Sequence, residues 1–114
     1  MNSVTLIGRL TSDPESAKTK SGTTRCRFRF AVPKLGSETP VFVDVVAFDR
    51  LAENCGEYLV RGRQVAVVGR LDYDEWTDAD GGRHSRHQVV ANQVDFLGSN
   101  RAEPDKEGEP VEAF

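Results

Sequence analysis

Residues 4–97 contain five segments with the composition of β-strands and one segment with the periodicity of a helix. Each strand-like segment is rich in β-branched and aromatic residues and is bounded by residues that favour turns. The helical segment begins at Asp49, which we expect to cap it, and ends before Arg61 and Gly62. Its apolar face consists of Leu51, Cys55, Tyr58 and Leu59. The predicted strands are Val4–Leu10, Thr23–Val32, Val41–Phe48, Gln64–Leu71 and Arg83–Leu97, with a polar loop over 72–82.

The position of the helix, between the third and fourth strands, is typical of one all-β architecture. It predicts an OB-fold, a five-stranded, partly open barrel that commonly receives oligonucleotides. The 114 residues allow a single domain, which we place at residues 1–98. Val65–Val68 and Val89–Ala91 are apolar at both strand parities, so we expect the second face to pack against another subunit or the helix.

The charge of the chain is divided unevenly along its length. Residues 99–114 lack hydrophobic periodicity and hold the whole net charge of −3, so that residues 1–98 sum to zero. We predict that residues 99–114 form a disordered acidic tail. A neutral domain can bind a nucleic acid only if its cations are gathered on one face.

Several classes of function have no support in the sequence. No secretory signal, transit peptide or long apolar stretch is visible, so we expect a cytoplasmic protein that contacts no membrane. Cys26 and Cys55 lack the spacing of a zinc site, and we predict no metal or cofactor, although an intersubunit disulfide remains open. No phosphate-binding loop or nucleophile motif occurs, which favours a binding protein over an enzyme.

The second predicted strand alternates charged and apolar side chains. Arg25, Arg27 and Arg29 share one face because successive side chains of a strand point to opposite sides, and the residues between them enter the core. This pattern favours phosphate contacts. The alternative is an ordinary solvated face neutralised by acidic residues such as Asp44 on the next strand.

The third predicted strand carries two aromatic residues on one parity. Val41, Val43 and Val45 form the aliphatic core side, which leaves Phe42 and Phe48 facing outward beside the arginines. Aromatic rings next to cations suit a single strand, because bases stack on the rings while the cations follow the phosphates. The alternative is that both rings are buried at an edge or interface.

Trp76 is the only tryptophan and falls in the predicted polar loop. A large aromatic side chain at a loop tip indicates binding, and the alternative is that the ring folds back to anchor the loop.

Together these segments resemble the bacterial single-stranded DNA-binding protein family. The resemblance covers residues 1–98 and rests on motifs that occur in order: Val4–Thr11, Asp13–Glu15, Ser21-Gly22, Phe48 with Leu51–Glu53, Tyr58-Leu59 and Val68–Leu71. It implies an OB-fold that binds and protects single-stranded DNA without sequence preference in replication, recombination and repair. It also implies a homotetramer.

The resemblance also implies roles for particular residues. Stacking aromatics fall on Phe42, Phe48 and Trp76, and a basic position after the third strand falls on Arg50. The candidate phosphate contacts are Arg9, Arg25, Arg27, Arg29, Arg50 and Arg70.

Three departures from the family pattern bear on affinity. The loop over 33–40 is short and lacks an aromatic residue, Asp44 stands where some members are basic, and Trp76 follows Asp72-Tyr73-Asp74-Glu75. Three carboxylates beside the phosphate path predict weaker, more salt-sensitive binding or a differently aimed loop, while Tyr73 offers extra stacking. The alternatives are a specialised second copy, a partner-binding or primosome-like accessory protein with weak DNA affinity, and a structural OB subunit that binds no nucleic acid.

The tail resembles the acidic ends through which family members recruit replication and repair proteins. The candidate partner-binding residues are Glu109, Glu112 and the terminal Phe114. A phenyl ring at the end of a flexible acidic segment suits an apolar pocket that is surrounded by basic residues. The alternative is a tail that only adds solubility.

Overall fold

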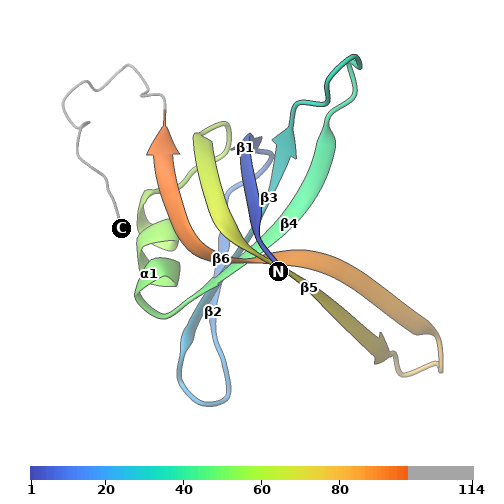
Figure 1. The fold of residues 1–114 in the computed structure, drawn as a ribbon. Coiled ribbons are helices and arrows are strands. Elements are labelled where there is room, and N and C mark those ends of the chain that lie inside the picture. Colours follow the sequence, from blue (N-terminus) through green and yellow to red (C-terminus); the bar gives the residue numbers. More distant parts are fainter. Residues whose placement is uncertain (98–114) are drawn as a thin grey trace.

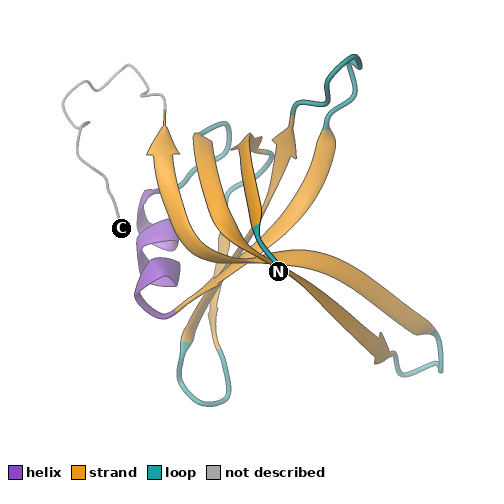
Figure 2. Cartoon of the chain, viewed as in Figure 1, coloured by secondary structure: helices purple, strands orange, loops and turns teal. Residues whose placement is uncertain are grey.

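The computed structural model describes residues 1–97 and shows a curved sheet with one helix at its side (Figures 1 and 2). The elements are β1 (Val4–Leu10), β2 (Glu15–Lys18), β3 (Thr24–Val32), β4 (Val41–Phe48), α1 (Asp49–Tyr58), β5 (Gln64–Thr77) and β6 (Arg83–Leu97). The predicted tail, with Glu109, Glu112 and Phe114, lies outside the described residues.

The sheet has the strand order β1-β5-β6-β4-β3-β2, and an additional pairing of β1 with β3 closes it into a barrel. The five strands of the barrel are the five that the sequence predicts, and the predicted all-β OB-fold with one helix is confirmed. All neighbours are antiparallel except β4 and β6, which run parallel. The sequence does not predict β2, which pairs only with β3 and is exposed throughout. Its residues, Glu-Ser-Ala-Lys, include no strong strand former.

The prediction of a loop from Asp72 to Gly82 is wrong for most of its length. β5 continues to Thr77 and pairs with β6 from Thr77↔Arg83 inward, so that the true turn is only 78–82. The two strands project beyond the barrel as a two-stranded arm, visible at the lower right of Figure 1. Backbone pairing with β6 outweighs the polar composition of these residues. We call residues 71–88 of this hairpin the arm.

The core lies between the inner face of the sheet and α1. Cys26, Phe28 and Phe30 of β3 are buried and the arginines between them are not, as the alternation predicts. Ala52, Cys55 and Leu59 close the core from the helix side, whereas Tyr58, predicted on the apolar face, is exposed.

The start of the helix also differs from the prediction. Phe48 is the N-cap and forms no side-chain cap hydrogen bond, so Asp49 does not cap the helix. Instead Asp49 occupies its first turn with a φ of 62°, in the left-handed region that aspartate tolerates better than most residues. Its carboxylate still favours a helix N-terminus.

Two glycines of the family-like motifs stand where strands cross closely. A Cβ on Gly8 would lie 2.4 Å from the carbonyl oxygen of Ala31, and one on Gly69 would lie 2.1 Å from that of Val90. Gly69 also marks the shift in register between β5 and β6. Barrel closure therefore requires a residue without a side chain at both positions.

Part of the outer face is buried within the chain itself. The alternation in β4 predicts that Val46 faces outward with Phe42 and Phe48, yet it is 1% exposed, and its neighbour Val90 on β6 is 8% exposed. Neither belongs to the main core cluster. Within the chain itself this explains the second apolar face at Val90, whereas Ala66 and Val68 of the other apolar run stay only half-buried.

Candidate nucleic-acid interface

The strand registers bring most of the predicted residues together in rows across the outer face of the barrel. One row runs Arg9, Ala31, Phe42 over β1, β3 and β4, and the next is Arg29 and Asp44. The third crosses four strands as Arg27, Val46, Val90 and Arg70, and the fourth is Arg25 and Phe48. Paired residues in a sheet point to the same side, so these side chains share one surface. We call it the β3–β4 face.

Both phenylalanines of this face are available to a ligand. Phe42 is 50% exposed and Phe48 is 38% exposed, which confirms that they face outward. The guanidinium of Arg29 lies 5.1 Å from the centre of the Phe42 ring and 4.0 Å from the carboxylate of Asp44. An exposed ion pair of this length contributes little to stability, and Asp44 faces only one of the three arginines of β3 at this distance.

Trp76 projects from β5 in the arm, not from a loop tip, and is 43% exposed. It stacks on His84 of β6, with ring centres 5.5 Å apart and an angle of 21° between the planes. The guanidinium of Arg86 lies 5.0 Å from the centre of the indole ring. Trp76 therefore stands in a prearranged stack of planar groups on one face of the arm.

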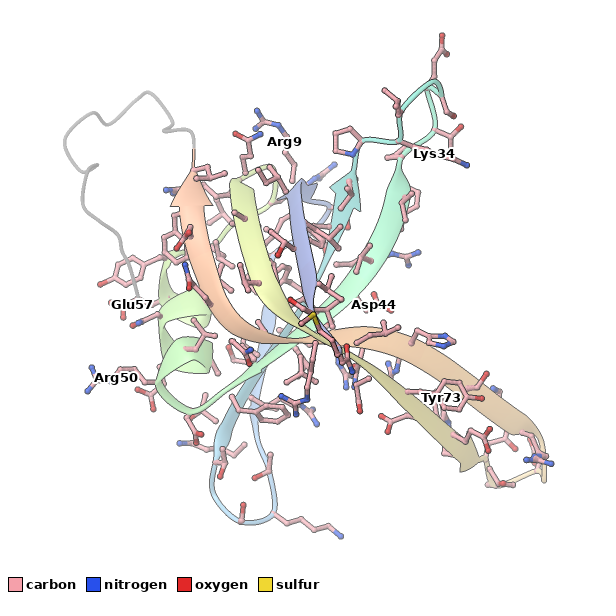
Figure 3. The ribbon with its side chains drawn as sticks, in the orientation of Figure 1. Arg9, Lys34, Asp44, Arg50, Glu57 and Tyr73 are labelled. Carbon is pink, nitrogen blue, oxygen red and sulfur yellow. The ribbon has the colours of Figure 1, made fainter. Side chains whose placement is uncertain are left out.

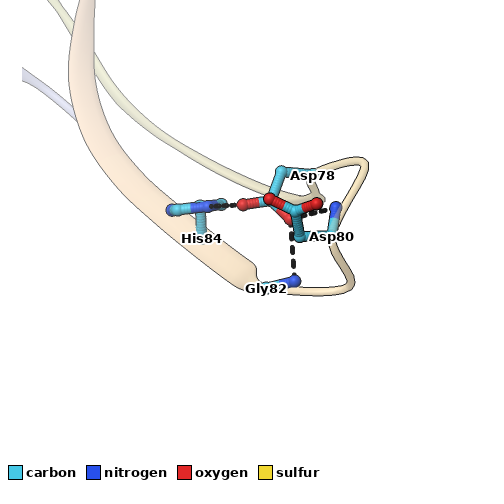
Figure 4. Close-up of polar contacts among 4 residues, drawn as sticks. All are labelled: Asp78, Asp80, Gly82 and His84. Carbon is cyan, nitrogen blue, oxygen red and sulfur yellow. Dashed lines mark hydrogen bonds and ion pairs between the residues drawn. The ribbon is translucent and has the colours of Figure 1, made fainter.

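The turn of the arm fixes the position of His84 (Figure 4). Asp78 accepts hydrogen bonds from the backbone N–H groups of Asp80 and Gly82, at 3.0 and 2.8 Å, and its other oxygen lies 2.7 Å from Nε2 of His84. The hydrogen bond with His84, followed by that from Gly82, lowers the pKa of Asp78. The turn and the stack are thus one connected unit.

The acidic residues before Trp76 are divided between the two faces of the arm. Asp72 and Asp74 share the face of Trp76, but Glu75 points to the other side, where it accepts a 2.7 Å hydrogen bond from Tyr73 and lies 3.6 Å from Arg83. Two carboxylates, not three, therefore lie on the predicted phosphate path. Tyr73 contacts His87 on the opposite face and does not join the stack.

Two predicted arginines lie at the margins (Figure 3). Arg9 is exposed, and its Nη1 donates a 3.0 Å hydrogen bond to the carbonyl of Gly62. Arg50 is exposed in the first turn of α1 and points away from the barrel. It is two residues from Phe48 but in none of the four rows.

Comparison with known proteins bears on this surface. Residues 1–97 match the family described as the single-strand binding protein family. The chain belongs to this family.

Relatives in several bacteria share the name of single-stranded DNA-binding protein. One from Caldanaerobacter subterraneus is 38% identical, with 100% of this chain and 83% of the relative covered. One from Thermotoga maritima is 37% identical, covering 95% and 82%. Single-stranded DNA-binding protein 2 of Nostoc is 33% identical, covering 90% and 83%. Membership of this family agrees with the expectation of a binding protein and not an enzyme.

For this family member, sequence reasoning misses two residues of the surface. His84 and Arg86 both contact Trp76, and no pattern within their own strand indicates either. Pairing residues 64–77 with 83–97 as one hairpin would find them, because Trp76 then stands opposite His84 and diagonal to Arg86.

The remaining sequence predictions concern metal ligands, membrane-spanning segments and the two cysteines, none of which belongs to this surface. Among residues 1–97 no cluster of His, Cys, Asp or Glu is arranged to hold a metal ion, and no helix is long and apolar enough to cross a membrane. Cys26 and Cys55 are free and buried. Burial raises the pKa of both thiols, that of Cys55 to about 12, so they are poor nucleophiles in the folded state.

Proposed function

We propose that this chain binds single-stranded DNA without sequence preference and protects it during replication, recombination and repair. The strand crosses the β3–β4 face and continues along the arm, with bases stacked on Phe42, Phe48 and Trp76. Phosphates are contacted by Arg25, Arg27, Arg29 and Arg70, with Arg9 and Arg50 at the margins. The observation that carries the proposal is the alternation of exposed aromatic rings with guanidinium groups on one continuous surface. The names of the relatives support it.

A titration of oligo-dT at low salt tests this function, followed by the fluorescence of Trp76 and by the anisotropy of a labelled oligonucleotide. We expect binding with quenching, and an affinity that falls with salt because neutralised phosphates release counterions. Binding without quenching would remove Trp76 from the site. No binding at low salt would refute the function.

A second function, that of an accessory protein with weak DNA affinity, is favoured by the carboxylates on the surface. Asp44 lies beside Arg29, and Asp72 and Asp74 share the face of Trp76. The same titration distinguishes the two functions by the salt range over which binding persists. Asp72→Asn and Asp74→Asn should extend that range if these carboxylates repel phosphate.

We also propose that the protein is a homotetramer that acts in the cytoplasm, at the nucleoid. An outer patch on β1 and β5 supports assembly: Ile7 is 48% exposed and pairs with Ala66, and Thr5 pairs with Val68. Light scattering coupled to size exclusion measures the mass, and Ile7→Glu should reduce it. An unchanged mass would place the subunit contact elsewhere.

The tail, residues 99–114, is proposed to bind replication and repair proteins through Glu109, Glu112 and Phe114. Deleting it should leave DNA affinity unchanged or raised, because its carboxylates compete with phosphate. A large loss of affinity would contradict this role. Retention of partner proteins by the full chain, but not by a chain lacking Phe114, would support it.

A further inference from the structure

Two arginines close to the base of the arm have a buried nitrogen without a partner. Nε of Arg27, on β3, and Nε of Arg86, on β6, are inaccessible to solvent and form no hydrogen bond with any described residue. Neither side chain has an ion pair within residues 1–97. Neither guanidinium group is therefore held by an acceptor or by an ion-pair partner among the described residues.

The sheet topology brings these arginines together from distant parts of the sequence. Arg27 pairs with Val46, Val46 pairs with Val90, and Arg86 precedes Val90 by four residues on the same face of β6. Val46 and Val90 form an apolar floor between them, 1% and 8% exposed. Gln88 lies between Val90 and Arg86, and its buried amide oxygen also has no partner. Its amide nitrogen donates a 3.5 Å hydrogen bond to Asp74, which leaves the oxygen as the unpaired atom of the amide.

The two guanidinium groups repel one another. Burial, and then repulsion from Arg86 and Arg25, lowers the pKa of Arg27, while Asp44 and Glu15 act more weakly in the opposite direction. An arginine nevertheless stays charged at neutral pH. Asp74 stands opposite Arg86 on β5 but forms no ion pair with it, so an anion placed between the two guanidinium groups would still relieve their repulsion.

We infer that Arg27 and Arg86 together bind one phosphate group of the single strand, between the β3–β4 face and the arm. The inference rests on the proposed function and adds a shared phosphate site to it. Guanidinium groups are suited to this because each presents several N–H donors in a planar fork to phosphate oxygens. With Arg86 also over the ring of Trp76, the site would set where a strand leaving the β3–β4 face begins to stack on the arm.

The test is the salt dependence of oligo-dT binding, measured by anisotropy for the full chain and four variants. These are R27Q, R86Q, the double variant R27Q/R86Q, and R83Q as the matched control. Arg83 lies on the same strand as Arg86, but on the other face of the arm beside Glu75. For a single strand, each phosphate that the protein no longer neutralises reduces the slope of log affinity against log salt by about 0.7.

We expect R27Q and R86Q each to weaken binding and to reduce the slope by less than about 0.7, because the other arginine still faces the shared phosphate, and the double variant to reduce it by about 0.7. R83Q should keep the original slope. A reduction of about 1.4 in the double variant would mean two separate phosphates and would overturn the inference. So would an R86Q protein that behaves like R83Q.

The R86K variant separates the effect of the charge at this position from the effect of the planar guanidinium group. It should keep the slope while binding more weakly, since lysine keeps the charge but not the fork. A slope as low as that of R86Q would overturn the inference. Failure of the unaltered chain to bind at all would instead refute the proposed function, so the two failures are distinguishable.

Discussion

Replacing Phe42 with leucine tests base stacking in the first row of the β3–β4 face. Leucine keeps an apolar side chain on the row with Ala31 and Arg9 but has no π-face on which a base can stack. Stacking on an aromatic side chain contributes about 1–3 kcal/mol per base, which corresponds to a loss of about 5- to 150-fold in affinity. The slope of affinity against salt should not change, because every phosphate remains neutralised.

The same position allows packing to be separated from stacking. An aromatic side chain buries about 150–250 Å², so half burial of Phe42 corresponds to at most about 3 kcal/mol of folding free energy at 25 cal/mol per Å². Phe42→Ala would remove much of this together with the base stacking, whereas Phe42→Leu should melt close to the unaltered protein.

Anisotropy of labelled oligo-dT at one fixed salt concentration measures the affinity, and thermal unfolding monitored by circular dichroism checks the fold. Tyr58→Leu is the matched control, because Tyr58 is 54% exposed but lies on α1. If Phe42→Leu folds normally and binds within about twofold of the unaltered chain, short of the ~1 kcal/mol minimum for a stacked base, bases do not stack at Phe42.

Three further predictions concern the barrel and the arm. Gly69→Ala should lower the free energy of unfolding by about 1–3 kcal/mol, because its Cβ would lie 2.1 Å from the carbonyl oxygen of Val90. Gly56→Ala is the control and should be nearly neutral, because its Cβ meets only the flexible hydroxyl of Ser16. Urea unfolding measures both variants, and equal stability would contradict the role of Gly69. Burial raises the pKa of Cys55 from its ordinary value of 9.0 to about 12, so stability should fall as pH rises through this range. A thiol reagent at pH 8 should react only as fast as the protein unfolds, and rapid labelling would show that the core opens. Folding lowers the pKa of Asp78, so the contribution of this carboxylate to stability is present at neutral pH and is lost as pH falls below the ordinary pKa of 3.8. Asp78→Asn should remove this acid dependence and loosen the stacking of His84 on Trp76, which the fluorescence of Trp76 measures.

The barrel could be predicted from the sequence because its strands alternate clearly. In β3 a buried residue separates each arginine from the next, so the alternation of side chains along the strand identifies both faces. The arm could not be predicted in this way. Asp72 to Thr77 resemble a loop in composition, and only their pairing with β6, which local patterns do not encode, makes them a strand.

The candidate site can be predicted where one strand carries the signal and is missed where two strands share it. Phe42 and Phe48 follow from the alternation within β4. Arg86 follows only from the register that sets it diagonal to Trp76, and Val46 is buried because of neighbours on β3 and β6 that its own strand does not reveal.

The closure of the barrel has a consequence for how the protein is made. β1 pairs with β5 from Val4↔Gly69 to Arg9↔Gln64, so Val4 finds its partner only after 65 more residues have been translated. At about 5–20 residues per second this interval is roughly 3–13 s. During it only Arg9 and Leu10 of β1 have a partner, on β3, and the rest of β1 is an unpaired edge with an apolar face, open to nascent chains on neighbouring ribosomes. The exposed Thr5 and charged Arg9 on its other face are the features of this strand that oppose such pairing.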